Sequence, residues 1–262
     1  MDYTRREIAA LTLGGLASLA MAGCRAESIK PRSPRTLRVL TYNIHHGEGT
    51  DKQFDYERLA AVIQKLEPDV VALQEVDRGT ERASGVDQAR LLAKLCHMHY
   101  AFGQAMPHQG GQYGEAILSR FLIENTFVHP LPYQLDREPR AAIEVVIAPP
   151  GIGPISVVGT HLCHQSNELR TLQTQRLSQL FPSQKGKPVI LAGDFNARPG
   201  SDPMNVLLNA GWIDTVAPRS VIDYVLVRQC DPWAVEDVVI LDEPVASDHD
   251  PVLVVLRWQG GK

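Results

Sequence analysis

Short apolar runs bounded by Pro, Gly or polar residues recur along the chain and predict its strands. The clearest is Pro188-Val189-Ile190-Leu191-Ala192-Gly193, which is typical of a strand buried on both faces. Further strands are expected at 37–44, 69–75, 113–118, 121–129, 140–148, 153–161, 222–227, 234–241 and 251–258. Apolar residues at helical spacing predict helices at 55–67, 89–96 and 166–181, and a short one from Ser201 to Leu208.

The order of these elements indicates the fold class. Strands outnumber helices, and several strands follow one another directly. This order disfavours a doubly wound sheet, in which strands and helices alternate. It favours an α/β fold of two packed sheets with the helices outside. The chain has 262 residues, 44% of them hydrophobic and 21% charged, which is enough for one large domain.

Polar residues stand at the ends of the predicted strands. The strand at 188–193 runs into Asp194 and Asn196, which alternation along a strand would point the same way. An acid and an amide aimed together are suited to holding a water and accepting its proton. An Asx-type turn that closes a buried strand is the alternative. Similar strand ends carry Asn43, Glu75, His161, Asp223 and the segment Ser247-Asp248-His249-Asp250-Pro251.

The donors in this set are mostly oxygen atoms, which suit Mg²⁺ or Mn²⁺. They come from Asn43, Glu75, Asp194, Asn196 and Asp248. The sequence contains no HExxH, CxxC or P-loop motif, and no Gly-x-Ser-x-Gly elbow that would supply a serine nucleophile. The pattern therefore favours water activated beside an oxygen-ligated metal ion.

The first residues indicate export. Thr4-Arg5-Arg6-Glu7-Ile8 is a twin-arginine signature, and an apolar stretch follows it up to Gly23-Cys24. We expect residues 1–24 to be a signal peptide ending in a lipoprotein box, Cys24 to carry a lipid, and residues 25–36 to be a linker. The protein would then be a periplasmic or cell-envelope lipoprotein, held at the membrane by Cys24. Plain secretion after Ala22 is the alternative.

Six segments stand at the strand ends in a fixed order: Thr41-Tyr42-Asn43-Ile44-His45-His46-Gly47, Leu73-Gln74-Glu75-Val76-Asp77, Thr160-His161-Leu162, Gly193-Asp194-Phe195-Asn196, Ile222-Asp223-Tyr224 and Ser247-Asp248-His249-Asp250-Pro251. Together they resemble the endonuclease/exonuclease/phosphatase superfamily of DNase I-like nucleases, sphingomyelinases and inositol polyphosphate phosphatases, in particular its small exported bacterial members. The resemblance covers residues 37–258. It implies a four-layer α/β/β/α sandwich of two mixed sheets with the site at one edge of the sheets.

The resemblance also implies a role for each matching residue. Glu75 is the expected principal metal ligand, with Asn43 and Asp248. Asp194 is expected to position or deprotonate the attacking water, with Asn196 as its partner. His249 is expected at the scissile phosphate, oriented by Asp223. His161 is a further phosphate-contacting histidine.

Three positions are candidate substrate contacts. His45 stands where many family nucleases have an acid, and Glu115 stands where Asn is usual, so Glu115 would either repel a substrate phosphate or bind metal. Arg140 would clamp a phosphate, because guanidinium matches phosphate geometry, or would form a surface salt bridge.

The predicted function is a metal-dependent phosphoesterase that uses Mg²⁺ or Mn²⁺ on a small or lipid-linked phosphodiester or phosphomonoester. The formal net charge is -4, and no basic run is interleaved with aromatics. Nucleic acid is therefore a less favoured substrate, because its binding depends on neutralised phosphates. The alternatives are a secreted endonuclease or exonuclease and a catalytically dead, lipid-anchored binding protein.

Overall fold

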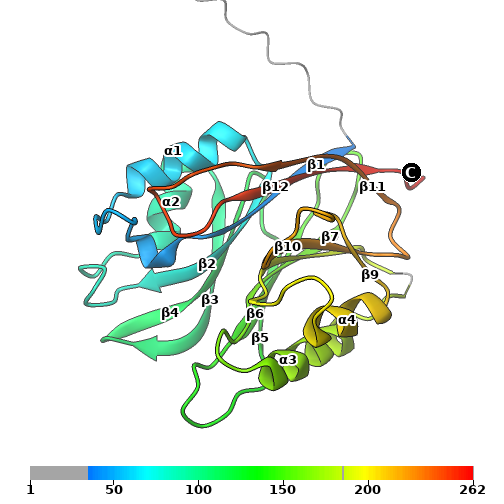
Figure 1. The fold of residues 1–262 in the computed structure, drawn as a ribbon. Coiled ribbons are helices and arrows are strands. Elements are labelled where there is room, and N and C mark those ends of the chain that lie inside the picture. Colours follow the sequence, from blue (N-terminus) through cyan, green and yellow to red (C-terminus); the bar gives the residue numbers. More distant parts are fainter. Residues whose placement is uncertain (1–34, 185, 262) are drawn as a thin grey trace, which may run out of the picture. The chain divides into compact units, whose positions relative to one another are not determined.

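The computed structural model describes residues 35–184 and 186–261. The predicted signal peptide, Cys24 and nearly all of the predicted linker lie outside these residues. Two six-stranded sheets make up the centre of the fold (Figure 1), one in the order β11-β12-β1-β2-β4-β3 and the other in the order β5-β6-β7-β8-β10-β9. The strands of the first sheet are β1 (Thr36–Asn43), β2 (Val70–Arg78), β3 (His99–His108), β4 (Gly111–Ser119), β11 (Trp233–Ile240) and β12 (Val252–Trp258).

The second sheet consists of β5 (Asn125–Pro130), β6 (Ala141–Ile147), β7 (Ile155–His161), β8 (Val189–Asp194), β9 (Trp212–Asp214) and β10 (Asp223–Arg228). Each sheet is mixed and contains one parallel pair of central strands, β1 with β2 and β7 with β8. A helix lies between the strands of each parallel pair in the sequence. Because parallel strands place their carboxyl ends at the same edge of a sheet, Asn43 and Glu75 lie near one another, as do His161 and Asp194.

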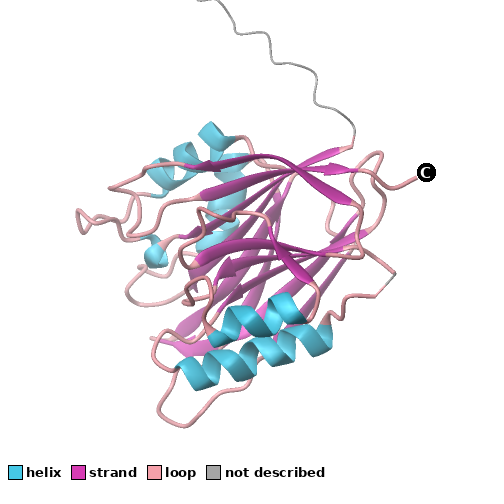
Figure 2. Cartoon of the chain, turned by 45° about the vertical axis from the view of Figure 1, so that its right-hand side comes forward, coloured by secondary structure: helices cyan, strands magenta, loops and turns pink. Residues whose placement is uncertain are grey.

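The helices cover the outer faces of the sheets, as Figure 2 shows. Helices α1 (Tyr56–Leu66) and α2 (Gln88–Cys96) pack on the first sheet, and α3 (Asn167–Leu180) and α4 (Asp202–Asn209) pack on the second. Alternating residues of one strand serve two cores: Val39 faces the other sheet and Leu40 faces the helices. Ile190 and Leu191 divide in the same way on the second sheet. The predicted four-layer α/β/β/α sandwich is confirmed.

Two strands were not predicted from the sequence. β3 and β9 are the edge strands at one end of each sheet. β3 carries exposed and half-buried polar residues together with Gly103 and Pro107, so its sequence lacks the apolar run of a central strand. Among the described residues, no helix combines the length and the apolar character that a membrane span requires.

Candidate active site

The polar strand ends of both sheets meet at one edge of the sandwich. Asn43 ends β1 and His161 ends β7, while Asp194 ends β8. Asp223 opens β10 directly opposite Asp194 in the antiparallel register. His249 lies in the segment that enters β12, which pairs with β1. Residues far apart in the sequence therefore converge because the two parallel pairs and their antiparallel neighbours end at the same place.

Asn43 joins the two sheets through its side-chain amide. Its Nδ2 donates to Glu75 Oε1 at 3.0 Å and to Asp194 Oδ2 at 3.3 Å. Asp194 is buried, and its other oxygen, Oδ1, accepts from the Asn196 backbone N–H at 2.8 Å. Asn196 has a φ of 48°, so the chain leaves the strand in an Asx-type turn. The Asx-type turn considered from the sequence is therefore present, and it places Asn196 beside Asp194.

Glu75 is held in an unusual backbone conformation inside β2. Its φ is 58°, and the register of β2 against β4 shifts between Leu73 and Val76, which is a β-bulge. His46 Nδ1 lies 3.7 Å from Glu75 Oε2. Burial alone would raise the pKa of Glu75, but the neighbouring His46, the hydrogen bond from Asn43 and the charges of nearby histidines hold the pKa well below the usual range. Glu75 is thus a carboxylate that is ready to bind a cation.

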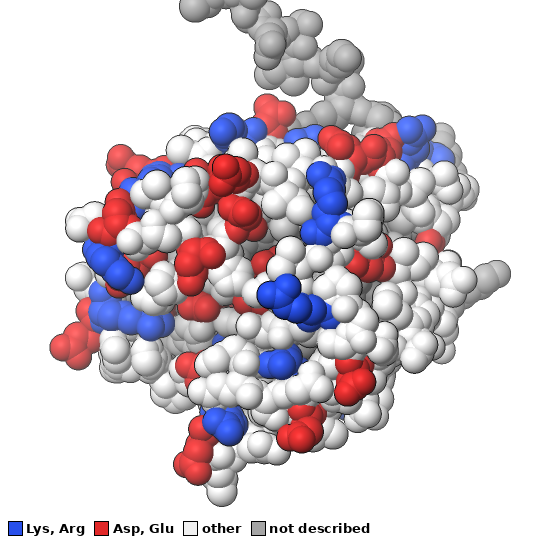
Figure 3. Space-filling view, in the orientation of Figure 1, with Lys and Arg blue, Asp and Glu red and all other residues white. Residues whose placement is uncertain are grey.

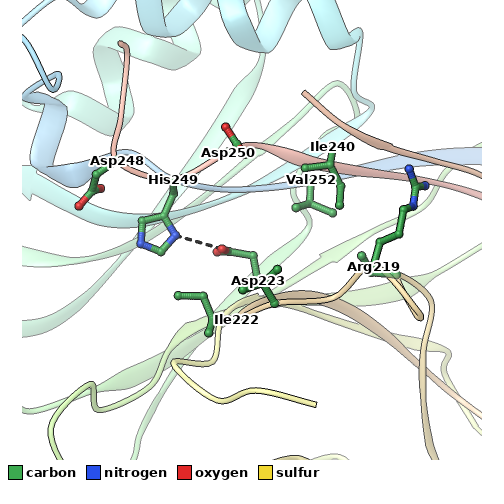
Figure 4. A pocket seen from close by; sticks show the side chains of 10 residues that line it. Arg219, Ile222, Asp223, Ile240, Asp248, His249, Asp250 and Val252 are labelled. Atoms are coloured by element: carbon green, nitrogen blue, oxygen red, sulfur yellow. Dashed lines mark hydrogen bonds and ion pairs between the residues drawn. The ribbon is translucent and has the colours of Figure 1, made fainter. Parts of the chain in front are cut away.

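His249 and Asp223 form a hydrogen-bonded pair (Figure 4), with His249 Nδ1 at 3.0 Å from Asp223 Oδ2. His249 Nε2 lies 3.7 Å from Asp194 Oδ2. Burial alone would lower the pKa of His249, but its hydrogen bond to Asp223 and the negative charges of Asp223 and Asp194 raise it to about 9. The ring is therefore an imidazolium at neutral pH. Burial and the charge of Asp223 raise the pKa of Asp194 to about 7.

His161 connects Asp194 to Arg140 in the wall of the site. Arg140 donates from Nη1 to His161 Nδ1 at 2.9 Å and from Nη2 to Glu138 Oε2 at 2.7 Å. Because Arg140 can only donate, His161 Nδ1 accepts, while His161 Nε2 lies 2.9 Å from Asn196 Nδ2 and 3.4 Å from Asp194 Oδ2. Burial and the charge of Arg140 hold the pKa of His161 well below its usual value. Arg140 is only 2% exposed, so its ion pair with Glu138 holds a buried guanidinium in the wall of the site.

A polar pocket of about 240 Å³, which we call the catalytic pocket, is lined by Glu75, Arg140, His161, Asp194, Asn196 and His249. Its wall also contains residues that the sequence analysis missed: His46, Arg82, His108, Tyr113, Glu138 and His164. Arg82 is fixed by Asp77 at 2.6 Å and lies over the Tyr113 ring. His108 belongs to the unpredicted strand β3. The paired Gly110-Gly111 turn is the only sequence signal for this hairpin.

Three candidate residues do not lie where the sequence analysis placed them. His45 does not line the pocket, because the chain after Asn43 makes a 3-10 turn at His45–Gly47 and presents His46 instead. Glu115 is fully buried, since alternation along β4 places it on the same face as Ile117, between the sheets. Asp248 is exposed and lines a neighbouring pocket with His249 rather than the catalytic pocket.

The remaining oxygen donors fit a divalent cation. The carboxylates of Glu75 and Asp194 flank the same Asn43 amide, and both residues line the catalytic pocket. Asp194, Asp223 and His249 also offer ligand atoms within 4.8 Å of one another. In that trio, however, Nδ1 of His249 is engaged by Asp223 and the ring is cationic, so it suits a proton relay better than a metal site. Glu75 is the residue that would hold Mg²⁺ or Mn²⁺, since Asn43 turns a donor, Nδ2, toward both carboxylates.

Two curated proteins show what the chain is similar to in sequence. The chain is 31% identical to an inositol phosphosphingolipids phospholipase C of Saccharomyces cerevisiae over 78% of the chain and 48% of the yeast protein. It therefore spans about half the length of that relative. It is 29% identical to the uncharacterised Escherichia coli protein YbhP over 62% of the chain and 67% of YbhP.

Solved structures show the same fold. An endonuclease/exonuclease/phosphatase from Beutenbergia cavernae superposes with a TM-score of 0.72 at 27% identity, covering 86% of this chain and 72% of that one. A mannosyl-6-phosphatase from Bacteroides thetaiotaomicron superposes with a TM-score of 0.68 at 20% identity, covering 85% of this chain and 100% of that one. The model of the endonuclease/exonuclease/phosphatase family matches residues 40–249. The chain belongs to the endonuclease/exonuclease/phosphatase family.

Proposed function

We propose that this protein is a divalent-metal-dependent phosphoesterase that hydrolyses a small or lipid-linked phosphodiester by direct attack of water. The observation that carries the proposal is the position of Asp194. Its Oδ2 lies 3.3 Å from the Asn43 amide, which also binds Glu75, and 3.7 Å from the cationic ring of His249. A base, a cation site and a fixed positive charge thus meet in one pocket.

Asp194 is the group that accepts the proton of the attacking water. Its pKa of about 7 is close to neutral pH, where a general base is most effective. The bond from the Asn196 backbone N–H fixes Asp194 Oδ1, which leaves the orientation of the carboxylate defined. Asn196 also donates from Nδ2 to the Leu162 carbonyl at 3.1 Å, so its own amide is held in place.

His249 and Arg140 provide positive charge for the phosphoryl group. The imidazolium of His249, held by Asp223, stabilises negative charge that grows on the phosphoryl oxygens. Arg140 is fixed by His161 and Glu138 and reaches the same pocket. Glu75 would hold a divalent metal ion, which would supply Lewis-acid polarisation of the phosphate. The groups that a catalytically dead binding protein would lose are thus all present and brought together.

Two observations support a small or lipid-linked substrate. The similar yeast protein is named as a phospholipase C of inositol phosphosphingolipids, which are lipid phosphodiesters. On the face drawn in Figure 3, basic and acidic residues are interspersed over the described surface, without a continuous basic band. Polymeric nucleic acid is bound largely through neutralised phosphates, so it is the less favoured substrate.

The experiment that tests the substrate class is a parallel assay with Mg²⁺ or Mn²⁺. Phosphosphingolipids, phosphoinositides, plasmid DNA and RNA oligomers are offered at several salt concentrations. We expect release of the lipid headgroup and little nicking of the plasmid. Efficient, salt-sensitive plasmid nicking without lipid turnover would instead establish the secreted nuclease.

Export and lipidation at Cys24 belong to the same proposal, because a tether would hold the site near phospholipid headgroups. Detergent phase partitioning of the full chain, with Cys24→Ser as the control, tests this part. We expect the wild type in the detergent phase and the variant in water. Recovery of the mature wild type wholly in the aqueous phase would contradict the anchor.

A further inference from the structure

A second pocket has His249 and Asp223 among its lining residues (Figure 4). We call it the inter-sheet pocket. Its volume is about 240 Å³. His249 and Asp223 form one end, and His249 also lines the catalytic pocket. Any group that fills the inter-sheet pocket therefore lies beside the position of the scissile phosphate.

The walls of the inter-sheet pocket are mainly aliphatic. Val216 and Val252 belong to the core between the sheets, and Ile240 packs against that core. Ile222 and Val221 come from the loop that enters β10, and Val221 is 53% exposed at the surface. An apolar group that enters this space leaves water for a surface built from β-branched side chains, which favours binding in proportion to the area buried.

Arg219 lies at the end of the inter-sheet pocket away from His249, as Figure 4 shows. Its guanidinium donates to the Val238 carbonyl of β11, so it bridges the β10 side of the pocket to the first sheet. The loop that carries Arg219 is fixed by Asp214, which accepts from the Val216 backbone N–H at 2.9 Å and from Ser220 Oγ at 2.5 Å. The pocket thus has a defined length between the catalytic dyad and Arg219.

Two acidic residues also line the inter-sheet pocket. Asp248 and Asp250 are both exposed. Further phosphates of a nucleic-acid strand would meet these carboxylates at close range, and like charges repel. An uncharged aliphatic group does not incur this cost.

We propose that the inter-sheet pocket is a subsite for an aliphatic group esterified to the scissile phosphate. The inference rests on the proposed phosphoesterase function and deepens it, since it defines the organic part of the substrate. The pocket runs from His249 to Arg219, so it accommodates only the first part of a long aliphatic chain. A longer chain continues past Val221 into solvent or lipid.

The test is a series of 4-nitrophenyl n-alkyl phosphates from methyl to octyl, kept below their micellar concentrations. Water adds to phosphorus, the bond to the aryl oxygen breaks, 4-nitrophenolate leaves, and the alkyl phosphate remains. We expect kcat/KM to rise roughly two- to fourfold per methylene and to level off once the chain extends past Val221 into solvent. A flat series on an enzyme that hydrolyses the methyl ester would overturn the subsite and leave the proposed function intact.

Binding is measured separately, so that the two proposals fail in different ways. Calorimetry of the metal-free protein with butyl, hexyl and octyl phosphate should show Kd falling with chain length. Dependence on chain length without turnover of any ester would support the subsite and contradict the proposed function. Equal affinity for all three alkyl phosphates would overturn the subsite.

Two variants locate the effect, and both change exposed residues. Val221→Ser should reduce the increase in kcat/KM per methylene for the longer alkyl chains, without changing turnover of the methyl ester. Arg219→Ala opens the far end, so the level region should move to longer chains. Val235→Ser and Arg257→Ala are the matched controls, since Val235 is also exposed and neither residue lines the pocket. Identical chain-length profiles in all four variants would place the alkyl group elsewhere and overturn the assignment.

Discussion

Glu115 gives the stability of this protein a pH dependence that can be worked out from the structure. Its side chain is fully buried, and neither carboxyl oxygen has a hydrogen-bond partner among the described residues. Burial raises its pKa to about 8; Arg140 opposes the rise and Glu75 adds to it. Glu115 is therefore protonated in the folded protein at neutral pH, whereas in the unfolded chain it ionises near its usual pKa of about 4.3.

The sign follows from proton counting. Between the two pKa values the folded state holds a proton that the unfolded state has lost, so the free energy of unfolding falls as pH rises. The free energy of unfolding falls by about 1.4 kcal/mol for each pH unit. A rise from pH 5 to pH 8 should therefore lower it by roughly 4 kcal/mol through Glu115 alone. Below the unfolded-state pKa the contribution is constant.

Glu115→Gln removes the ionisation and keeps the volume. Guanidinium unfolding of wild type and variant at pH 5, 6, 7 and 8, with EDTA present, gives the two pH slopes. For each pH unit, we expect the free energy of unfolding of the wild type to fall by about 1 kcal/mol or more relative to that of Glu115→Gln. Glu124→Gln, at an exposed glutamate, is the control and should keep the wild-type slope. Equal slopes for wild type and Glu115→Gln would show that Glu115 is ionised in the fold and would refute the reasoning.

The remaining predictions concern the catalytic pocket. Asp223→Asn should lower activity and move the basic limb of the pH profile below the pKa of about 9 that Asp223 helps His249 to reach; an unchanged limb would contradict the pairing. Glu75→Gln should raise the Mg²⁺ concentration needed for half activity, measured by metal titration, and an unchanged midpoint would exclude Glu75 as a ligand. Arg140→Lys should reduce kcat/KM about 10- to 100-fold, because an ammonium cannot replace the guanidinium's hydrogen bonds to both His161 and Glu138. Circular dichroism checks that the variant is folded, and wild-type kinetics in the folded variant would show that these hydrogen bonds are not needed.

The central strands and the helices were predictable because their apolar patterns are local. β8 and α1 lie within a residue of their predicted limits, since each buries a face that its own sequence displays. β3 was not predictable in this way, because an edge strand with exposed residues carries little of that pattern. What stabilises β3 is its pairing with β4, a partner that the sequence of β3 does not specify.

The candidate site shows the same division. Asp194, His161 and Asp223 could be identified because the strands that carry them are predictable from their apolar patterns. The fold then brings these three residues together. Strand alternation predicted that Asn196 lies beside Asp194, and it does. The cause is different, because the chain at Asn196 is a turn with positive φ and not a strand. The choice of His46 over His45 depends on another such turn, which no local apolar pattern reveals.

The most direct test of the central claim is hydrolysis of bis(4-nitrophenyl) phosphate by wild type and Asp194→Asn across a Mg²⁺ and Mn²⁺ titration. The account predicts turnover only with divalent metal, and a loss of about 10²–10⁴-fold in Asp194→Asn, with metal binding by calorimetry largely retained. Wild-type turnover in Asp194→Asn would contradict the assignment of the base. No turnover with any divalent metal, on folded wild-type protein, would contradict the proposed reaction itself.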